Sequence, residues 1–191
     1  MPDPAPTPDP APASASASAS EAAPASPHSA DGSVLRHAAL ADIDPRTVYL
    51  LAKLRQDVFT LEQHATDADL DGRELESGTT LLWLEVPGLL AARAGLSGEP
   101  VAQLRMLREA DGTVRIGRVA VRADHRRAGY GRRLMQASLD HVTAALPGAD
   151  VHIDAQAHLE KWYDSMGFET VSGLFLEAGI EHVAMVRRAR S

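Results

Sequence analysis

Residues 119–133 read Val-Ala-Val-Arg-Ala-Asp-His-Arg-Arg-Ala-Gly-Tyr-Gly-Arg-Arg, and this stretch decides the fold. An alternating apolar strand runs into a basic glycine turn, and a helical apolar pattern follows. Glycine has no Cβ, so the backbone at Gly129 and Gly131 can approach a ligand closely. The first N–H groups of a helix lack intrahelical acceptors and carry a partial positive charge. The stretch therefore predicts an anion-binding site.

Four arginines flank this turn in an otherwise acidic chain, and they make a diphosphate the favoured anion. They are Arg126, Arg127, Arg132 and Arg133. The usual dinucleotide and P-loop patterns are absent, because Leu134 stands where a third glycine would follow and no Gly-Lys-Ser/Thr occurs. A structural alternative stays open, since glycine before a helix is common and the chain has 17 arginines against two lysines. Composition and spacing together favour the anion site.

The residues before this stretch predict one long helix and an acidic loop. Asp44 can cap a helix that begins at Pro45, because proline tolerates the first helical position. Apolar residues then recur at steps of three and four, so one helical face points to the core as far as about Gln63. Residues 65–78 are polar and acidic, and they predict a loop longer than a connector needs.

Strands and two further helices complete one mixed sheet. Asp111-Gly112 predicts a tight hairpin, so the strands on either side of it are antiparallel. The expected strands cover residues 34–38, 79–86, 100–106, 114–121, 151–155, 169–176 and 182–188, and the expected helices begin near residues 45, 129 and 158. The early hairpins and the later βαβ order predict an α/β fold class of the mixed α+β kind, with helices on the faces of the sheet.

Composition divides the chain into a tail and one domain. Residues 1–33 hold eight of the twelve prolines and no Lys or Arg, which predicts a disordered Pro/Ala/Ser-rich tail without a secretion signal. Residues 34–191 have the size of one domain. The net charge of −7 argues against a nucleic-acid partner, and no apolar run reaches the roughly 20 residues that cross a bilayer. With no cysteine, the chain has neither disulfides nor a thiolate nucleophile, and we expect it in the cytoplasm.

The basic glycine turn resembles the acyl-CoA motif of a known family. Residues 126–131 fit the Arg/Gln-Xaa-Xaa-Gly-Xaa-Gly/Ala pattern of the GNAT superfamily of N-acetyltransferases, with the strand before it and the helix after it in the expected places. The segments that resemble the ElaA-like branch of that superfamily are residues 54–63, 69–72, 116–119, 155–159, 162–163 and 166–168. The resemblance covers residues 35–187 and departs from the family pattern at residues 65–68 and 86–100.

The resemblance implies a GNAT acyl-CoA N-acyltransferase fold, in which a central, mostly antiparallel sheet is splayed in the middle and helices cover both faces. It implies acetyl-CoA as co-substrate, held where the strand of residues 115–121 leaves that of residues 151–155. A main-chain N–H near Val119 would stabilise the oxyanion of the reaction. The residues implied in binding acetyl-CoA are Val119, Ala120, Val121, Arg126, Arg127, Ala128, Gly129, Tyr130, Gly131, Arg132 and Gln156.

The implied reaction is direct acetyl transfer to a primary amine, because the missing cysteine closes an acyl-cysteine route. Tyr163 follows Gln156 by seven residues, the spacing at which this superfamily places a tyrosine beside the CoA sulfur, and it is the expected general acid. Of the neighbours Trp162 and Tyr163, Trp162 is expected to be the core residue.

The general base stays open among Glu62, Asp71 and His158. Glu62 follows the apolar face of the first helix near the expected acceptor entrance, and we count it as the catalytic carboxylate. Asp71 and His158, together with Arg55 and Arg118, are the expected substrate-binding residues. The eight histidines show no metal-binding spacing such as His-Glu-Xaa-Xaa-His, so no metal is expected.

The leading function is therefore an acetyl-CoA-dependent N-acetyltransferase acting on a small-molecule or peptide amine, with a homodimer as one possible assembly. A first alternative is an acyl-homoserine-lactone synthase-like enzyme. The arrangement of Arg55, Phe59 and the pair of Asp69 and Asp71 resembles the N-terminal half of such enzymes. The tryptophan expected shortly after that phenylalanine is missing. A second alternative is a non-catalytic acyl-CoA-sensing module.

Overall fold

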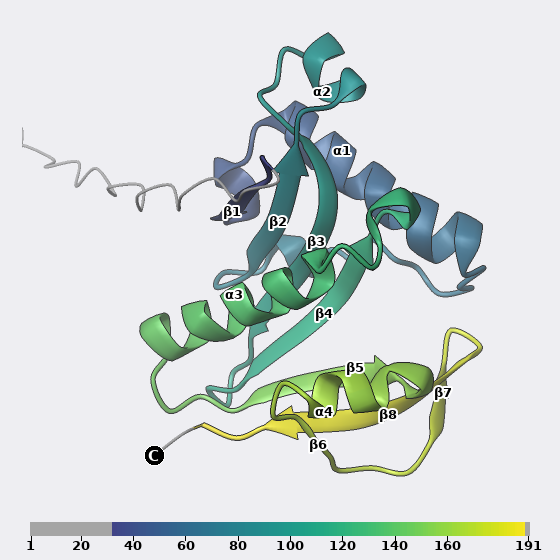
Figure 1. Cartoon of the computed structure of the whole chain (residues 1–191). Helices are drawn as coiled ribbons and strands as arrows, with labels where there is room; N and C mark the ends of the chain where they lie inside the picture. The colour runs from purple at the N-terminus through teal and green to yellow at the C-terminus, as the bar shows by residue number, and fades with distance from the viewer. Residues whose placement is uncertain (1–31, 190–191) are drawn as a thin grey trace, which may run out of the picture.

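The computed structural model describes residues 32–189, so the tail predicted for residues 1–33 lies almost entirely outside the described residues. Figure 1 shows the strands and helices of this part of the chain. The strands are β1 (Val34–Ala38), β2 (Thr80–Val86), β3 (Glu99–Arg108), β4 (Val114–Val121), β5 (Val151–Gln156), β6 (Glu169–Thr170), β7 (Phe175–Glu177) and β8 (Ile180–Arg187). The helices are α1 (Pro45–Arg55), α2 (Leu89–Arg93), α3 (Tyr130–Ala145) and α4 (Glu160–Asp164), and a π-helical segment, Gln56–Glu62, continues α1.

The eight strands form one mixed sheet. Its main path runs β1-β2-β3-β4-β5-β8-β6, and β7 also pairs with β8. Every neighbouring pair is antiparallel except β4 and β5. A parallel pair needs a long crossover connection, and α3 supplies it. The mixed α+β class expected from the sequence is confirmed.

Helices cover both faces of the sheet because β2 sends alternate side chains to opposite sides. Leu82 and Leu84 join the main core, to which α3 contributes its buried face. Leu81 and Trp83 pack with Leu51 of α1 in a second cluster. Figure 1 shows α3 in front of the strands and α1 behind them. Both helices thus hold the first four strands as one layer.

β4 and β5 pair over only two residues before they separate. The pairs are Val114 with Val151 and Arg115 with His152. Farther along, the register between β3 and β4 shifts by one residue, and Arg118 at this β-bulge adopts a φ of 55°. A bulge bends its strand and increases the local twist. The splay expected in the middle of the sheet is therefore present, between β4 and β5.

The predicted elements are present, with three differences. The connection after β2 contains the short helix α2. The strand predicted over residues 169–176 is two short strands, because Ser172 Oγ accepts the N–H of Ala184 at 2.8 Å and interrupts the ladder. The predicted helix is π-helical in its second half, where the N–H of Gln63 donates to the carbonyl of Val58, five residues earlier, at 3.0 Å.

Two buried arginines hold the acidic loop that follows α1 against the sheet. Arg55 is 3% exposed and donates to Asp69 at 2.8 Å and to Glu74 at 2.5 Å. Arg105 of β3 donates to Asp71 and to the same Glu74, both at 2.6 Å. The hydrogen bonds from Arg105 hold the pKa of the Asp71 carboxyl far below its ordinary value. Charges removed from water are stable only when paired, so these arginines and carboxylates depend on each other.

Replacement of Arg55 by alanine is expected to destabilise the fold by about 3–5 kcal/mol, because Asp69 and Glu74 would each lose one of their two arginine partners while staying largely withdrawn from water. Arg188→Ala is the control, since it removes an exposed ion pair with Asp150 and should cost less than about 1 kcal/mol. Urea unfolding followed by circular dichroism measures the free energy of unfolding of both variants. Equal losses in the two would contradict the role given to the buried network.

Candidate functional site

The turn before α3 has the backbone shape of an anion site. Arg127 and Gly129 have φ values of 66° and 84°, and left-handed residues turn successive N–H groups toward one side. The N–H of Arg133 donates to the carbonyl of Gly129 at 3.0 Å and starts the ladder of α3. The N–H groups of Gly131 and Arg132 precede that ladder. This geometry suits an anion such as a diphosphate.

Two arginines of the turn attach it to neighbouring elements. Arg126 donates to both carboxylate oxygens of Glu62, at 2.6 and 2.7 Å, and through Nε to the carbonyl of Val121 at 3.1 Å. The bond from Arg126 lowers the pKa of the Glu62 carboxyl. The guanidinium of Arg132 lies 5.9 Å from the ring centroid of Trp162. Glu62 thus connects the π-helical segment to the turn.

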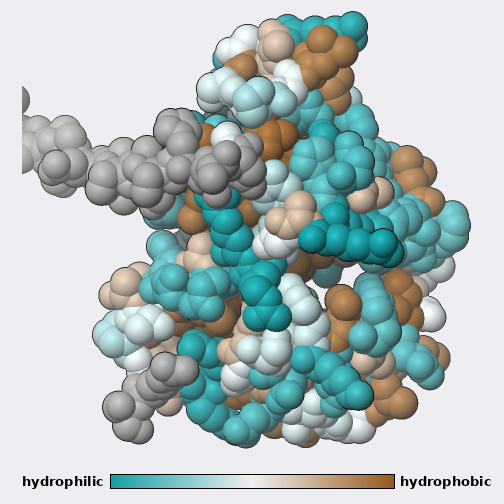
Figure 2. Space-filling model, in the orientation of Figure 1, coloured by the Kyte–Doolittle hydropathy of each residue, from teal (hydrophilic) through white to brown (hydrophobic). Residues whose placement is uncertain are grey.

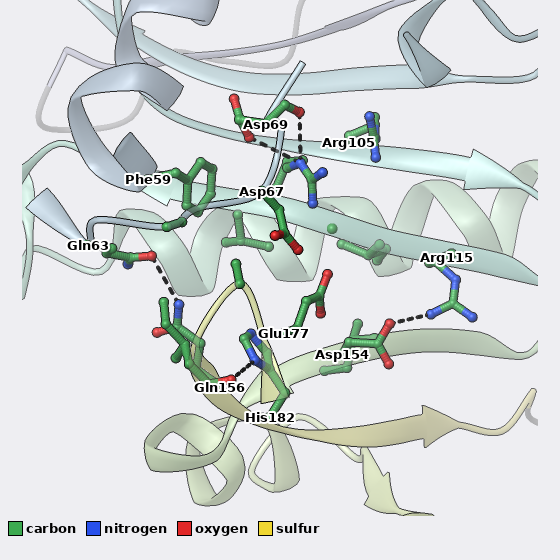
Figure 3. A pocket seen from close by; sticks show the side chains of 18 of the residues that line it. Phe59, Gln63, Asp67, Asp69, Arg105, Arg115, Asp154, Gln156, Glu177 and His182 are labelled. Atoms are coloured by element: carbon green, nitrogen blue, oxygen red, sulfur yellow. Dashed lines mark hydrogen bonds and ion pairs between the residues drawn. The ribbon is translucent and has the colours of Figure 1, made fainter. Parts of the chain in front are cut away.

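A cavity of about 460 Å³ opens where β4 and β5 separate. Its wall comes from the π-helical segment, the acidic loop, β3, β4, β5, α4 and the hairpin of β7 and β8. Figure 3 shows side chains from these elements around a common space. In the space-filling view of Figure 2, an opening is visible between the part of the molecule that carries β4 and the part that carries β5. The gap in the sheet therefore leads into the cavity.

The cavity wall carries an uncompensated negative charge. Its four arginines are all paired with carboxylates: Arg73 with Glu76 and Glu109, Arg105 with Asp71 and Glu74, Arg115 with Asp154, and Arg118 with Asp69 and Asp71. Asp67 and Glu177 are also on the wall, and the side chain of neither has an ion pair or a hydrogen bond within residues 32–189. Both point into the cavity in Figure 3. A cation in the cavity would balance them.

Tyr163 of α4 brings a buried phenol to the cavity wall. It is 6% exposed, and its ring packs edge-on against Trp162 and Phe168, with centroids 4.7 and 5.9 Å away. Burial raises the pKa of Tyr163 to about 12, so the phenol stays protonated near neutral pH and can donate a proton. The expectation that Trp162 would be the core residue is wrong. Trp162 is only partly buried, because its ring covers the first turn of α3 beside Gly131.

The predicted site residues divide between the cavity wall and its surroundings. Those on the wall are Val119, Arg118, Gln156 and Tyr163. Those off the wall are Glu62, Arg55, Asp71 and His158. Ala120 and Val121 continue β4, and residues 126–132 form the turn and the start of α3. Arg55 donates to the carboxylates of Asp69 and Glu74 and to the main-chain carbonyl of Asp69. His158 is exposed.

Among the wall residues that were not predicted as site residues, three have titratable side chains outside any ion pair of the described residues: Asp67, Glu177 and His182. The first is one of several acidic residues in the loop, and nothing in the sequence separates it from its neighbours. His182 lies opposite Gln156 through the pairing of β5 with β8, which is a long-range contact. One signal was available, because His182 is a polar residue next to the buried Val183 in an apolar strand.

Residues 32–189 contain neither a metal centre nor a membrane-spanning helix. No three His, Cys, Asp or Glu side chains of this part of the chain are arranged to hold a metal ion. None of its helices has the length and apolar character needed to cross a bilayer.

Comparisons with known proteins agree with this geometry. Residues 54–189 match the acetyltransferase (GNAT) domain family. The UPF0039 protein Rv2851c of Mycobacterium tuberculosis is 38% identical over 156 residues, which cover 80% of this chain and 92% of that protein. The crystal structure of Escherichia coli ElaA matches with a TM-score of 0.72 and 30% identity, over 82% of this chain and 99% of that one. An acyl-CoA N-acyltransferase from Pseudomonas aeruginosa matches with the same TM-score and identity, over 81% and 99%. The chain therefore belongs to the GNAT family of acyltransferases, in its ElaA-like branch, and its splayed mixed sheet is the GNAT acyl-CoA N-acyltransferase fold.

Proposed function

We propose that this protein is an acetyl-CoA-dependent N-acetyltransferase that transfers the acetyl group directly to a primary amine of a small molecule or peptide. The observation that carries the proposal is the position of Tyr163, a buried phenol on the wall of the cavity where β4 leaves β5. Membership of the GNAT family supplies the reaction class, acyl transfer from an acyl-CoA. The acetyl group and the amine acceptor are the finer part of the proposal.

The proposed donor site lies along β4 and the turn before α3. The main chain of Val119 and Val121 would bind the pantetheine arm, and the N–H groups of residues 127–132 would bind the pyrophosphate. The turn fits this role, because a Cβ built on Gly129 would meet no atom within 4 Å and the backbone is therefore open to a ligand. The N–H near Val119 would stabilise the oxyanion. Gln156, on the facing strand, completes the proposed donor contacts.

The charge of the cavity supports an amine acceptor. Asp67 and Glu177 are the two unpaired carboxylates of the described wall, and they would attract an ammonium group. Arg105 and Arg118 also reach the wall, but their carboxylate partners already neutralise them. An acidic acceptor would therefore find no unpaired arginine on the wall, whereas a cationic one would find two carboxylates.

The proposed reaction follows from these groups. The neutral amine attacks the carbonyl carbon of the thioester, the N–C bond forms, and the C–S bond breaks. Tyr163 donates a proton to the departing sulfur, which is the role of a general acid, and the nitrogen gives its surplus proton to the Tyr163 oxygen as the amide forms. Since the chain has no cysteine, the acetyl group passes to the amine without an acyl-cysteine intermediate.

Gly129→Ala is expected to weaken acetyl-CoA binding about tenfold, because a residue with a Cβ resists a φ of +84° by about 1–2 kcal/mol and would distort the turn. Gly112→Ala is the matched control. Gly112 has a φ of +87° and open space around it, but it lies in the hairpin between β3 and β4. Titration calorimetry with acetyl-CoA measures both affinities. A similar loss in the two variants, or no loss in either, would contradict the assignment of the turn to the donor.

A screen of amines with acetyl-CoA, followed by release of free thiol, is expected to show the fastest transfer to amines that carry a second positive charge. Glu177→Gln should raise the KM for such amines about fivefold, the size of one partly screened ion pair, and should raise the KM of amines without a second positive charge less. Glu181→Gln, an exposed change on β8, is the control. Binding of acetyl-CoA without transfer to any amine would favour the sensing module instead. Product formed only with S-adenosylmethionine and an acyl donor would favour the lactone-synthase alternative.

Tyr163→Phe is expected to lower kcat about 100-fold and to change the Kd of acetyl-CoA less than about twofold. Because the pKa of Tyr163 is raised to about 12, the phenol is protonated throughout the range below it. The loss should therefore be constant between about pH 6 and about pH 10. Tyr49→Phe, at an exposed tyrosine of α1, is the control. Initial rates across that range measure the effect, and full turnover in Tyr163→Phe would exclude the acid role.

A further inference from the structure

His182 lies on the cavity wall in a fixed orientation. It belongs to β8, opposite Gln156 of β5, and it is 8% exposed. Its ring stacks on Phe175 of β7, with centroids 6.0 Å apart and planes 27° from parallel. Figure 3 shows the ring extending from the strand toward the cavity. Packing between two neighbouring strands thus holds a titratable side chain at the proposed acceptor site.

The hydrogen bond of His182 determines which ring nitrogen carries the proton. Nδ1 lies 2.8 Å from the carbonyl oxygen of Ile180. A carbonyl oxygen only accepts, so Nδ1 donates, and the lone pair of the neutral ring is on Nε2. Within residues 32–189, no group forms a hydrogen bond with Nε2. Histidine is the side chain best suited to take up and release a proton near neutral pH.

His182 and Tyr163 reach the cavity from opposite faces of the sheet. Val183 and Met185 of β8 lie in the main core together with Tyr163, so alternation along the strand directs His182 to the other face. The gap between β4 and β5 connects the two faces. A thioester placed in that gap would have a proton donor on the side of its sulfur and a proton acceptor on the side of the incoming amine.

The charges around His182 explain why a base is needed. The titratable groups that share its cavity come from six elements. They are Asp154 on β5, Glu177 on β7, Tyr163 on α4, Arg105 on β3, Arg115 and Arg118 on β4, and Asp67, Asp69 and Arg73 in the acidic loop. Asp154 is paired with Arg115 at 2.6 Å, while His158, after β5, is exposed and off the wall. The unpaired Asp67 and Glu177 favour the ammonium form of the acceptor. An ammonium nitrogen has no lone pair, so it must lose a proton before it can attack.

The three bases considered from the sequence, Glu62, Asp71 and His158, are less suitable by position, and His158 is exposed and off the cavity wall. Glu62 is held by two hydrogen bonds from Arg126, which lower its pKa, and it is not on the cavity wall. Asp71 is paired with Arg105 and Arg118, also off the wall. His182 is the histidine of the described wall, and its Nε2 has no competing partner.

We propose that His182 is the general base that deprotonates the acceptor amine, an inference that rests on the proposed acetyltransferase function. Nε2 takes one proton from the ammonium group, and the amine lone pair then forms the N–C bond to the thioester carbonyl. When the C–S bond breaks, the sulfur takes the proton of Tyr163, and the nitrogen gives its second proton to the Tyr163 oxygen. The proton on His182 passes to solvent. The sum is ammonium plus thioester giving amide, thiol and one proton.

His182→Gln tests this role through the pH dependence of kcat/KM, with the best acceptor amine of the screen. At about pH 7 the variant should be about 100-fold slower than the wild type. The ratio of wild-type to variant kcat/KM should become smaller toward about pH 10, because an alkylamine is increasingly neutral there without help from the protein. A merely structural role would lower the rate by the same factor at every pH. His152→Gln, which changes a histidine of β5 outside the cavity wall, should match the wild type.

The outcomes separate this inference from the proposed function. If the wild type transfers acetyl groups and His182→Gln keeps the full rate, or loses it equally at all pH values, His182 is not the base. If it is Glu62→Gln whose kcat/KM approaches the wild-type value as the pH rises, Glu62 is the base. If the wild type transfers to no amine, the acetyltransferase proposal itself fails. The melting temperature and the acetyl-CoA affinity of His182→Gln are both expected to be near those of the wild type. These two values show whether the variant is correctly folded.

A second measurement does not depend on activity. Nitrogen NMR of the uniformly labelled protein, with His182→Gln used to assign the signal, reports which ring nitrogen carries the proton. The neutral ring of His182 should be protonated on Nδ1, and its Nε2 should be the nitrogen without a proton. A ring protonated on Nε2 when neutral would overturn the proposal, because no lone pair would then face the cavity.

Discussion

The separation of β4 from β5 is the constraint on which the rest of the structure depends. Only two residue pairs join these strands, and the bulge at Arg118 bends β4 away. Backbone groups in a sheet normally satisfy one another, so strands that part must offer theirs to another partner. The surrounding elements are placed accordingly. The first turn of α3 lies beside the end of β4, where Gly131 approaches Val121 and Trp162, and the cavity opens from the gap. One irregularity in one strand therefore creates the places proposed for the donor and for the acceptor.

Buried ion pairs decide both the shape and the charge of that cavity. Arg55 and Arg105 are almost fully withdrawn from water, and the cost of removing such charges is recovered only through close, hydrogen-bonded partners. The acidic loop supplies these partners, and in doing so it becomes a fixed wall. The same pairing cancels the positive charge of the arginines. Asp67 and Glu177 are then the unpaired charges of the described wall. The contacts that stabilise the loop therefore also leave the cavity with a negative charge, which would attract a cation.

The sequence predicted local features well and long-range ones poorly. Asp44 caps α1 as expected, because a cap depends on neighbours in the chain, and the glycine turn at Gly129 precedes a helix for the same reason. The general acid candidate Tyr163 came from the resemblance to the GNAT family, which implies a tyrosine at that spacing from Gln156 within one segment. His182 was missed because its place on the cavity wall follows from the pairing of β8 with β5, which no local pattern encodes. The burial of Trp162 was overestimated for the same reason. Its ring lies against Arg132 in the first turn of α3, and this tertiary contact is not encoded in the local sequence.

The groups proposed as acid and base, Tyr163 and His182, lie on opposite faces of one sheet. Tyr163 is surrounded by apolar rings, and burial raises its pKa to about 12 and keeps it a donor. His182 lies on the other face, where the carbonyl of Ile180 fixes Nδ1 as the donor and leaves Nε2 for the acceptor side. Groups whose surroundings favour opposite protonation states are suited to act as acid and base in one reaction. Because β5 and β8 are paired next to the gap, the backbone that extends the sheet also holds the proposed base in place. A loop-borne carboxylate such as Asp67 has no such support, so it is better suited to attracting the acceptor than to deprotonating it.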